Sequence, residues 1–204
     1  MKQAETSPPA DTVSPRRLSS EVVRKCLHFL IALVPLLASF HRPFTLLLLA
    51  AGTAAYALME ALRRSGRRVP VISALTDYAS RRRDRGRFVL GPLTLGMGAF
   101  LTILIFPPQT AAIAVYALAF GDGTASLAGK AIGRLRPPFL FGKSVEGSLA
   151  CFAGSFASAW LVSLNTRTAL TAAAAALATE LPPIRDWDNI IIPLVTGLAV
   201  TVLC

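Results

Sequence analysis

Charged residues are scarce in this chain of 204 residues, at 16% of the total, whereas hydrophobic residues make up 53%. Apolar runs of membrane-spanning length recur along the chain, so the composition excludes an ordinary water-soluble domain and indicates an integral membrane protein. An alternation of apolar and polar residues with a period of two is also missing, which favours helices over a transmembrane barrel. The sequence therefore predicts an all-α, polytopic helical bundle.

Cysteines and acidic residues are also few. Cys26, Cys151 and Cys204 are isolated in or beside apolar runs, and neither their odd number nor their spacing fits a disulfide framework or a metal site. The 11 acidic residues are outnumbered by 21 lysines and arginines, which gives a net charge of +10. We expect no nucleic-acid partner, because these basic residues fall in short loops beside apolar runs, where they attract anionic membrane lipids.

Seven apolar segments are candidates for membrane-spanning helices, with six as the alternative count. Most have the roughly 20 residues needed to cross a hydrocarbon core of about 30 Å. They form one predicted catalytic domain over residues 24–204, and the prolines and serines of residues 1–23 predict a flexible cytoplasmic tail rather than a signal peptide. The predicted spans are 25–40, 43–62, 88–106, 109–128, 145–164, 168–181 and 189–204.

The basic residues predict the orientation, because cytoplasmic loops retain positive charge during insertion. With the N-terminus in the cytoplasm, all lysines and arginines except Arg42 and Arg167 fall on the cytoplasmic side. The most basic loop, residues 63–87, is interpreted as a solvated stop-transfer loop, with a surface helix that contacts phosphate groups as the alternative. At its start we expect Glu60 to be a paired charge rather than a catalytic one.

Asp122 is the most informative charge, because a carboxylate at membrane depth costs at least about 2.5 to 3.5 kcal/mol unless it faces protein or water. It directly follows an apolar run, between two glycines, and on a helix it shares a face with Ser126 and Gly129. This face predicts a ligand site. The alternative is a carboxylate that only caps or breaks a helix at the interface.

A second polar group follows within one loop. Lys130 is followed by the triplet Gly142, Lys143 and Ser144, which precedes the fifth predicted span. Backbone amides at a helix N-terminus attract anions, so the triplet predicts a phosphate cradle. It does not form a Walker A motif, because Pro137 occupies the position of the required first glycine.

The order of these residues resembles the polyprenol kinase family, which includes dolichol kinase, phytol kinase and CTP-dependent diacylglycerol kinase. The central pattern, DxxASxxG[KR]xxG[KR] followed by GKSxEGS, is found here at 122–134 and 142–148. Two outer patterns support it, namely ExxRKxxH at 21–28 and Glu180 followed by DNxxxPL at 188–194. The resemblance thus covers residues 21 to about 197.

The resemblance implies a membrane-embedded kinase that transfers the γ-phosphate of CTP to a lipid alcohol such as phytol, polyprenol, dolichol or diacylglycerol. Phosphoryl transfer requires neutralisation of the triphosphate, for which Mg²⁺ is the expected cofactor. The expected location is a bacterial inner membrane, with the active site on the cytoplasmic side. The implied catalytic residues are Asp122, Glu146 and His28, and the implied metal ligands are Asp122 and Asp188. Nucleotide or phosphate binding is assigned to Ser126, Gly129, Lys130, Gly142, Lys143, Ser144, Gly147 and Asn189.

Alternatives remain for two of these residues and for the activity. His28 could be a buried structural residue, and Asn189 could only cap the last helix. Phosphatidate cytidylyltransferases share a similar central segment, but their long ending with His and a Gly-Gly pair is missing from residues 180–197. A transporter or non-catalytic lipid-phosphate binder is the remaining alternative, although no internal repeat supports it.

Overall fold

The computed structural model describes residues 26, 28–67 and 88–204, and this part of the chain is helical, without strands. Four of its helices are long and apolar enough to cross a membrane: Leu33–Arg64, Pro108–Ala131, Val145–Ser163 and Arg185–Leu203. Large outward side chains such as Phe40, Leu161 and Val202 are at least 70% exposed, as a lipid-facing surface requires. The predicted all-α fold is confirmed for the described residues, and the four apolar helices are consistent with the predicted membrane protein. The predicted tail, the residues Glu21, Arg24 and Lys25, and positions 68–87 of the basic loop lie outside the described residues.

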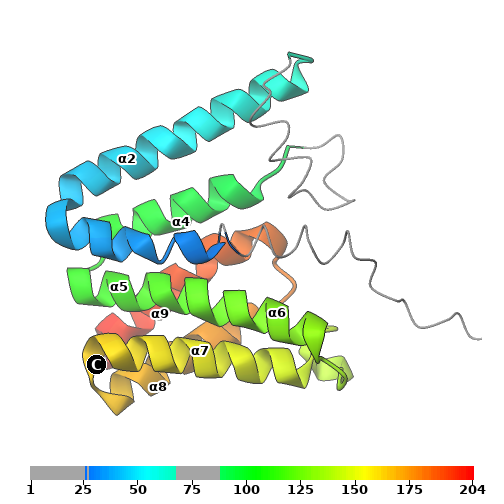
Figure 1. The fold of residues 1–204 in the computed structure, drawn as a ribbon. Helices are drawn as coiled ribbons and strands as arrows, with labels where there is room; N and C mark the ends of the chain where they lie inside the picture. The colour runs from blue at the N-terminus through cyan, green and yellow to red at the C-terminus, as the bar shows by residue number, and fades with distance from the viewer. Residues whose placement is uncertain (1–25, 27, 68–87) are drawn as a thin grey trace, which may run out of the picture.

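Helix α2 (Leu33–Arg64) consists of two arms that run in opposite directions (Figure 1). The break is at His41, whose backbone is not helical, with φ −154° and ψ 87°. Pro43 explains it, since proline has no N–H to donate and disfavours helical geometry in the residue before it. The inner arm (33–40) and the outer arm (42–64) therefore correspond to the first two predicted segments, and the predicted boundary between them is correct.

Helix α4 (Gly91–Ile105) packs beside the outer arm of α2. Its C-terminus is closed by Arg42, whose guanidinium donates to the carbonyl oxygens of Ile103, Leu104 and Phe106 at 2.7 to 3.3 Å. These carbonyls are the groups that a helix end leaves without an internal partner. The basic side chain thus takes the place of a C-terminal cap.

The centre of the bundle is one continuous helical segment from Pro108 to Ala131. It comprises α5 (Pro108–Tyr116), a π-helical turn η2 (Ala117–Asp122) and α6 (Gly123–Ala131). Its side chains from Ile113 to Ala119, Tyr116 excepted, are almost completely buried. Because this segment is surrounded by protein, it can carry a polar group such as Asp122 at low cost.

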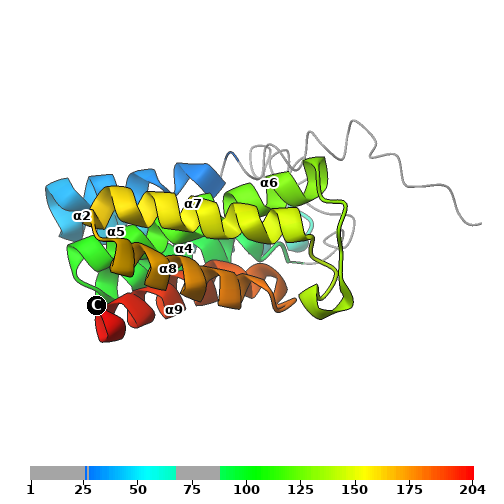
Figure 2. The same cartoon turned by 90° about the horizontal axis from the view of Figure 1, so that it is seen from below.

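Three further helices surround the central segment (Figures 1 and 2). They are α7 (Val145–Ser163), α8 (Thr166–Glu180) and α9 (Asp188–Leu203). A short 3₁₀ turn, η3 (Pro138–Leu140), lies between α6 and α7, and a second, η4 (Arg185–Trp187), lies between α8 and α9. The alanines of α8 that face the bundle are fully buried, which lets α7 and α9 approach closely, as the alanine-rich sequence predicts.

Helix α6 ends, and α7 and α9 begin, at the same end of the bundle (Figure 1), and the sequence of these segments and of the loops between them contains the basic residues Lys130, Arg134, Arg136, Lys143 and Arg185, so we call this the basic end. Among the described lysines and arginines, only Arg42, beside the break of α2, and Arg167, in the first turn of α8, belong to segments of the opposite end. Glu60 is fully buried near the basic end and accepts two hydrogen bonds of 2.7 Å from Arg63 and one of 3.0 Å from the Val89 N–H. The expectation that Glu60 is a paired charge is confirmed.

Candidate functional site

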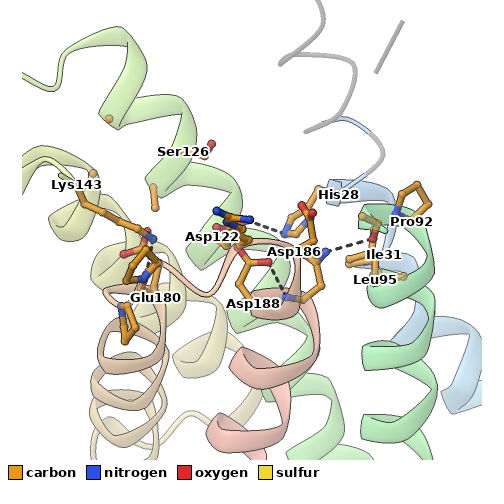
Figure 3. A pocket seen from close by; sticks show the side chains of 18 of the residues that line it. His28, Ile31, Pro92, Leu95, Asp122, Ser126, Lys143, Glu180, Asp186 and Asp188 are labelled. Atoms are coloured by element: carbon orange, nitrogen blue, oxygen red, sulfur yellow. Dashed lines mark hydrogen bonds and ion pairs between the residues drawn. The ribbon is translucent and has the colours of Figure 1, made fainter. Parts of the chain in front are cut away.

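The basic end of the bundle contains a cavity of about 770 Å³. Its walls come from the residues that precede α2, the outer arm of α2, α4, α6, the loops before α7 and α9, and the end of α8. Figure 3 shows Asp122, Asp186, Asp188 and His28 around one part of it, with Lys143 and Glu180 beside them. The part between α2 and α4 is mostly apolar, with Thr53 and Tyr56 as its polar side chains. The cavity therefore has a charged half and a hydrocarbon-like half.

Nearly all residues that the sequence singled out lie on this cavity, although they are up to 161 positions apart in the chain, from position 28 to position 189. The lining residues from the predicted set are His28, Asp122, Ser126, Gly129, Lys130, Gly142, Lys143, Ser144, Gly147, Asp188 and Asn189. Glu146 is the exception. The fold thus brings the predicted residues together on one cavity. The contacts of each residue indicate which chemical role it can have.

Asp122 and His28 form a buried pair at the π-helical turn. The Nε2 atom of His28 lies 3.2 Å from Oδ2 of Asp122 and 3.1 Å from the carbonyl oxygen of Leu118, which belongs to the same turn. A carbonyl oxygen can only accept a hydrogen bond, so Nε2 carries the hydrogen in its contact with Leu118. The side chains are 8% and 12% exposed. His28 therefore fixes the carboxylate of Asp122, and a π turn, which is frequent at functional sites, positions it.

Lys143 is held by Glu180 at the end of α8. Its Nζ donates both to Oε1 and to the main-chain oxygen of Glu180. The Glu180 side chain is 7% exposed and that of Lys143 is 31% exposed. The other carboxylate oxygen, Oε2, is buried and has no hydrogen-bond partner among the described residues. The ammonium group of Lys143 thus lines the cavity with part of its charge neutralised by Glu180.

The start of α7 does not offer the open phosphate cradle that the sequence predicts. Ser144 caps this helix, and its Oγ accepts from the Gly147 N–H at 3.1 Å. The Val145 N–H donates to the oxygen of Leu135 at 2.9 Å. These two amides are already bonded within the chain, which leaves the side chains of the cavity as the main candidates for contacts with phosphate groups.

The glycines of the central motif have a packing role. A Cβ atom on Gly147 would lie 3.0 Å from the carbonyl oxygen of Ala125 and 3.3 Å from Cα of Gly129, so α6 and α7 touch through their backbones here. Gly142 adopts φ +85°, a left-handed conformation that favours glycine. Arg136 secures the same loop by donating to the carbonyl oxygens of Gly142 and Gly129, each at 2.9 Å.

Glu146 points away from the cavity, toward the loop that follows α6. Its Oε1 accepts from the N–H groups of Arg134 and Leu135 at 3.0 and 3.3 Å. Both contacts are with main-chain groups, so the carboxylate orders the loop. This placement gives no support to the predicted catalytic role, which needs a group that reaches the reacting atoms.

At the start of α9, Asp188 and Asn189 have different partners. Asp188 Oδ1 accepts from the Asn189 N–H at 2.9 Å, and its side chain lines the cavity. The Asn189 amide nitrogen donates to Thr94 Oγ1 at 2.9 Å and to the Gly91 oxygen at 3.2 Å. Asn189 therefore ties α9 to α4, a role that the sequence did not indicate.

The carboxylates suit a magnesium ion that is shared with a substrate. Within the described residues no three His, Cys, Asp or Glu side chains are grouped closely enough to form a complete metal cage. Mg²⁺ is usually bound through only one or two carboxylates together with substrate phosphates, and it keeps several waters. Asp122 and Asp188, on the wall of one cavity with oxygen donors, fit that requirement.

Sequence reasoning missed several residues of the cavity. Glu180 was noted only as part of an outer pattern, although a charged residue that ends an apolar helix was a signal of the same kind as Asp122. Asp186, Arg136 and Arg185 also line the cavity. The apolar half could not be found from the sequence, because its residues look like any other lipid-facing or core positions.

Comparison with protein-family models, with curated proteins and with solved structures found no match to this chain. The family resemblance therefore continues to rest on the motif residues themselves.

Proposed function

We propose that this protein is a membrane-embedded kinase that transfers the γ-phosphate of CTP to the hydroxyl of a lipid alcohol. The observation that carries the proposal is the two-sided cavity. Its charged half has cationic and acidic side chains for a nucleotide triphosphate, and its apolar half extends into the bundle, where a hydrocarbon chain can be accommodated. The choice of CTP over other nucleotides rests on the motif resemblance.

In the proposed reaction, Asp122 accepts the proton of the acceptor hydroxyl while His28 holds the carboxylate in place. The hydroxyl oxygen forms a bond to the γ-phosphorus as the bond from that phosphorus to the β–γ bridging oxygen breaks, and CDP leaves with the electron pair. Lys130, Lys143 and Arg136 line the same cavity and counter the charge of the phosphates. Mg²⁺ would supply further positive charge when bound, with Asp188 and Asp122 as candidate ligands.

The proposal includes a membrane topology. If the two arms of α2 are counted separately, the chain crosses the membrane seven times, with the N-terminus and the cavity in the cytoplasm and the C-terminus outside. The basic residues in the segments at the cavity end support this orientation. A bacterial inner membrane is the proposed location.

The test uses purified protein in lipid nanodiscs with CTP that is labelled either in the γ-phosphate or in the cytidine. The acceptors are phytol, polyprenol, dolichol and diacylglycerol, with phosphatidate and ATP in parallel reactions. Label from the γ-phosphate in an alcohol supports the kinase. Cytidine label in phosphatidate instead identifies a cytidylyltransferase. Binding of nucleotide or lipid without either product overturns both enzyme assignments and leaves a transporter or binding protein.

A further inference from the structure

The apolar half of the cavity is a groove with its own walls. We call it the tail groove, and it is formed by Ile31, Leu48, Leu49, Gly52, Pro92 and Leu95. On the outer arm of α2, the cavity wall runs from Leu48 to Tyr56. These residues are eight positions apart, which corresponds to about 12 Å along a helix. The groove thus extends from the charged half toward the middle of the bundle.

Polarity changes along the groove in the order that a lipid with a polar head requires. His28 lines the charged half, and Ile31, three positions later, lines the groove. On α4, Gly91 accepts from Asn189 at the charged end, whereas Leu95 lies one turn deeper. Each of these two walls is polar near the loops and apolar below them, so the acceptor hydroxyl and its chain have a continuous path.

Gly52 keeps this path open. A Cβ atom at Gly52 would meet nothing within 4 Å, so the position borders empty space. At Gly96, by contrast, a Cβ would lie 2.3 Å from Thr53 Oγ1, which shows that α2 and α4 are in contact beside the groove. Leu48, one turn deeper than Gly52, is 50% exposed. The groove is therefore closed on the Thr53 side and opens to the surrounding lipid near Leu48.

We propose that the hydrocarbon chain of the acceptor alcohol lies in the tail groove, and that Gly52 determines which chains can pass. This proposal rests on the kinase function for the identity of the head group at the charged end. The occupant of the tail groove is a lipid substrate, and its chain continues beyond Leu48 into the bilayer. Short alcohols end before Gly52 and do not use it.

The matched variants are Gly52→Leu and Ala51→Leu, which add similar apolar volume on neighbouring positions of one helix. Ala51 is exposed and does not line the cavity. Gly52→Leu should raise KM for phytol at least tenfold and leave KM for dimethylallyl alcohol and CTP unchanged, because pocket selectivity per blocked group is roughly 10- to 200-fold. Ala51→Leu should behave as wild type. Equal phytol KM values in the two variants would overturn the proposal.

A second measurement does not depend on turnover or on the stability of a variant. Wild-type protein is irradiated with a long-chain prenyl alcohol that carries a diazirine in its chain, and the labelled peptides are identified by mass spectrometry. Labelling of residues 48–56 or 92–96, removed by competition with phytol, supports the tail groove. Labelling confined to other faces overturns it. If no lipid is phosphorylated while the groove is labelled, the kinase function fails and the lipid site stands.

Discussion

Asp122 is a carboxylate that the fold stabilises with one specific partner. A buried carboxylate is costly unless it is paired or hydrogen-bonded, and His28 pairs with it, with Nε2 3.2 Å from Oδ2 of Asp122. The same nitrogen also contacts the carbonyl oxygen of Leu118, so the pair is anchored to the backbone of the central segment. A carboxylate held in one orientation beside a cavity has the properties of a general base.

Replacement of Asp122 by Asn should lower kcat at least about a hundredfold, because an amide keeps the shape but cannot accept the hydroxyl proton. The measurement is the rate of γ-phosphate transfer, with the thermal unfolding midpoint recorded to show that the protein still folds. Asp186→Asn is the matched control, since Asp186 lines the same cavity and has no role in the proposed proton transfer. A wild-type kcat for Asp122→Asn would remove this residue from the mechanism.

The Lys143–Glu180 pair predicts unequal effects of its two neutral variants on stability. Lys143→Met leaves the 7% exposed carboxylate of Glu180 without its cation, which should cost about 3 kcal/mol of unfolding free energy. Glu180→Gln should cost less, because Lys143 is 31% exposed and remains solvated by the cavity. Thermal unfolding of the two single variants and the double variant measures this difference. A larger loss for Glu180→Gln, or strict additivity in the double variant, would contradict the pairing.

At the residue scale, the cost of placing a charge in lipid identified Asp122 as a candidate site residue. It did not predict which residues contact Asp122 or line the cavity with it. The contact with Leu118 depends on a π turn, and the capture of Lys143 by Glu180 depends on how α8 ends. Glu146 shows the converse. Its position in the motif indicated chemistry, whereas its bonds to Arg134 and Leu135 show a carboxylate that supports a loop.

At the scale of elements, the packing of α6 against α7 sets the shape of the charged half. The backbones meet at Gly147, next to the Ser144 cap, with no room for a side chain between them. Any widening there moves the loop that carries Lys143. The motif glycines are therefore required for close approach, in addition to any contact with a ligand.

Gly147→Ala should destabilise the protein by about 1 to 3 kcal/mol, because its Cβ would press on the Ala125 carbonyl oxygen and on Cα of Gly129, which are backbone atoms. Gly52→Ala is the control. It adds the same methyl group to a helix where nothing lies within 4 Å, and it should stabilise by up to about 1 kcal/mol. Chemical or thermal unfolding in detergent compares them. Equal effects would show that the α6–α7 contact is looser than these distances indicate.

Helix positions were largely predictable because apolar runs and prolines mark them directly. The break at His41 follows from Pro43, and α7 begins at the predicted residue 145. The π turn was not predictable, since nothing in the residues from Ala117 to Asp122 distinguishes it from an α-helix. The bonded N–H of Val145 at the start of α7 was not predictable for another reason. It depends on how the loop after α6 folds back and places the Leu135 carbonyl oxygen beside that helix.

For the whole molecule, the basic end and the two exposed cysteines provide a test of orientation. Cys26 precedes the cavity residue His28 by two positions, Cys204 is at the chain end marked C in Figure 1, opposite the cavity, and Cys151 is buried. In intact spheroplasts a membrane-impermeant maleimide should label Cys204 and spare Cys26, and inverted vesicles should give the opposite result. Variants that retain one of these cysteines separate the two signals. Labelling of both from the same side would exclude an odd number of crossings.

The bonds of Arg42 have a consequence for biosynthesis. Its main acceptor, the Ile103 carbonyl, is 61 residues further along the chain. Under the proposed topology, Arg42 reaches the non-cytoplasmic leaflet during synthesis before Ile103 has been translated. During that interval the guanidinium has only water and headgroups as partners, and the first helical hairpin is incomplete. The bonds of Arg42 to the end of α4 can therefore form only after residues 103–106 have been synthesised.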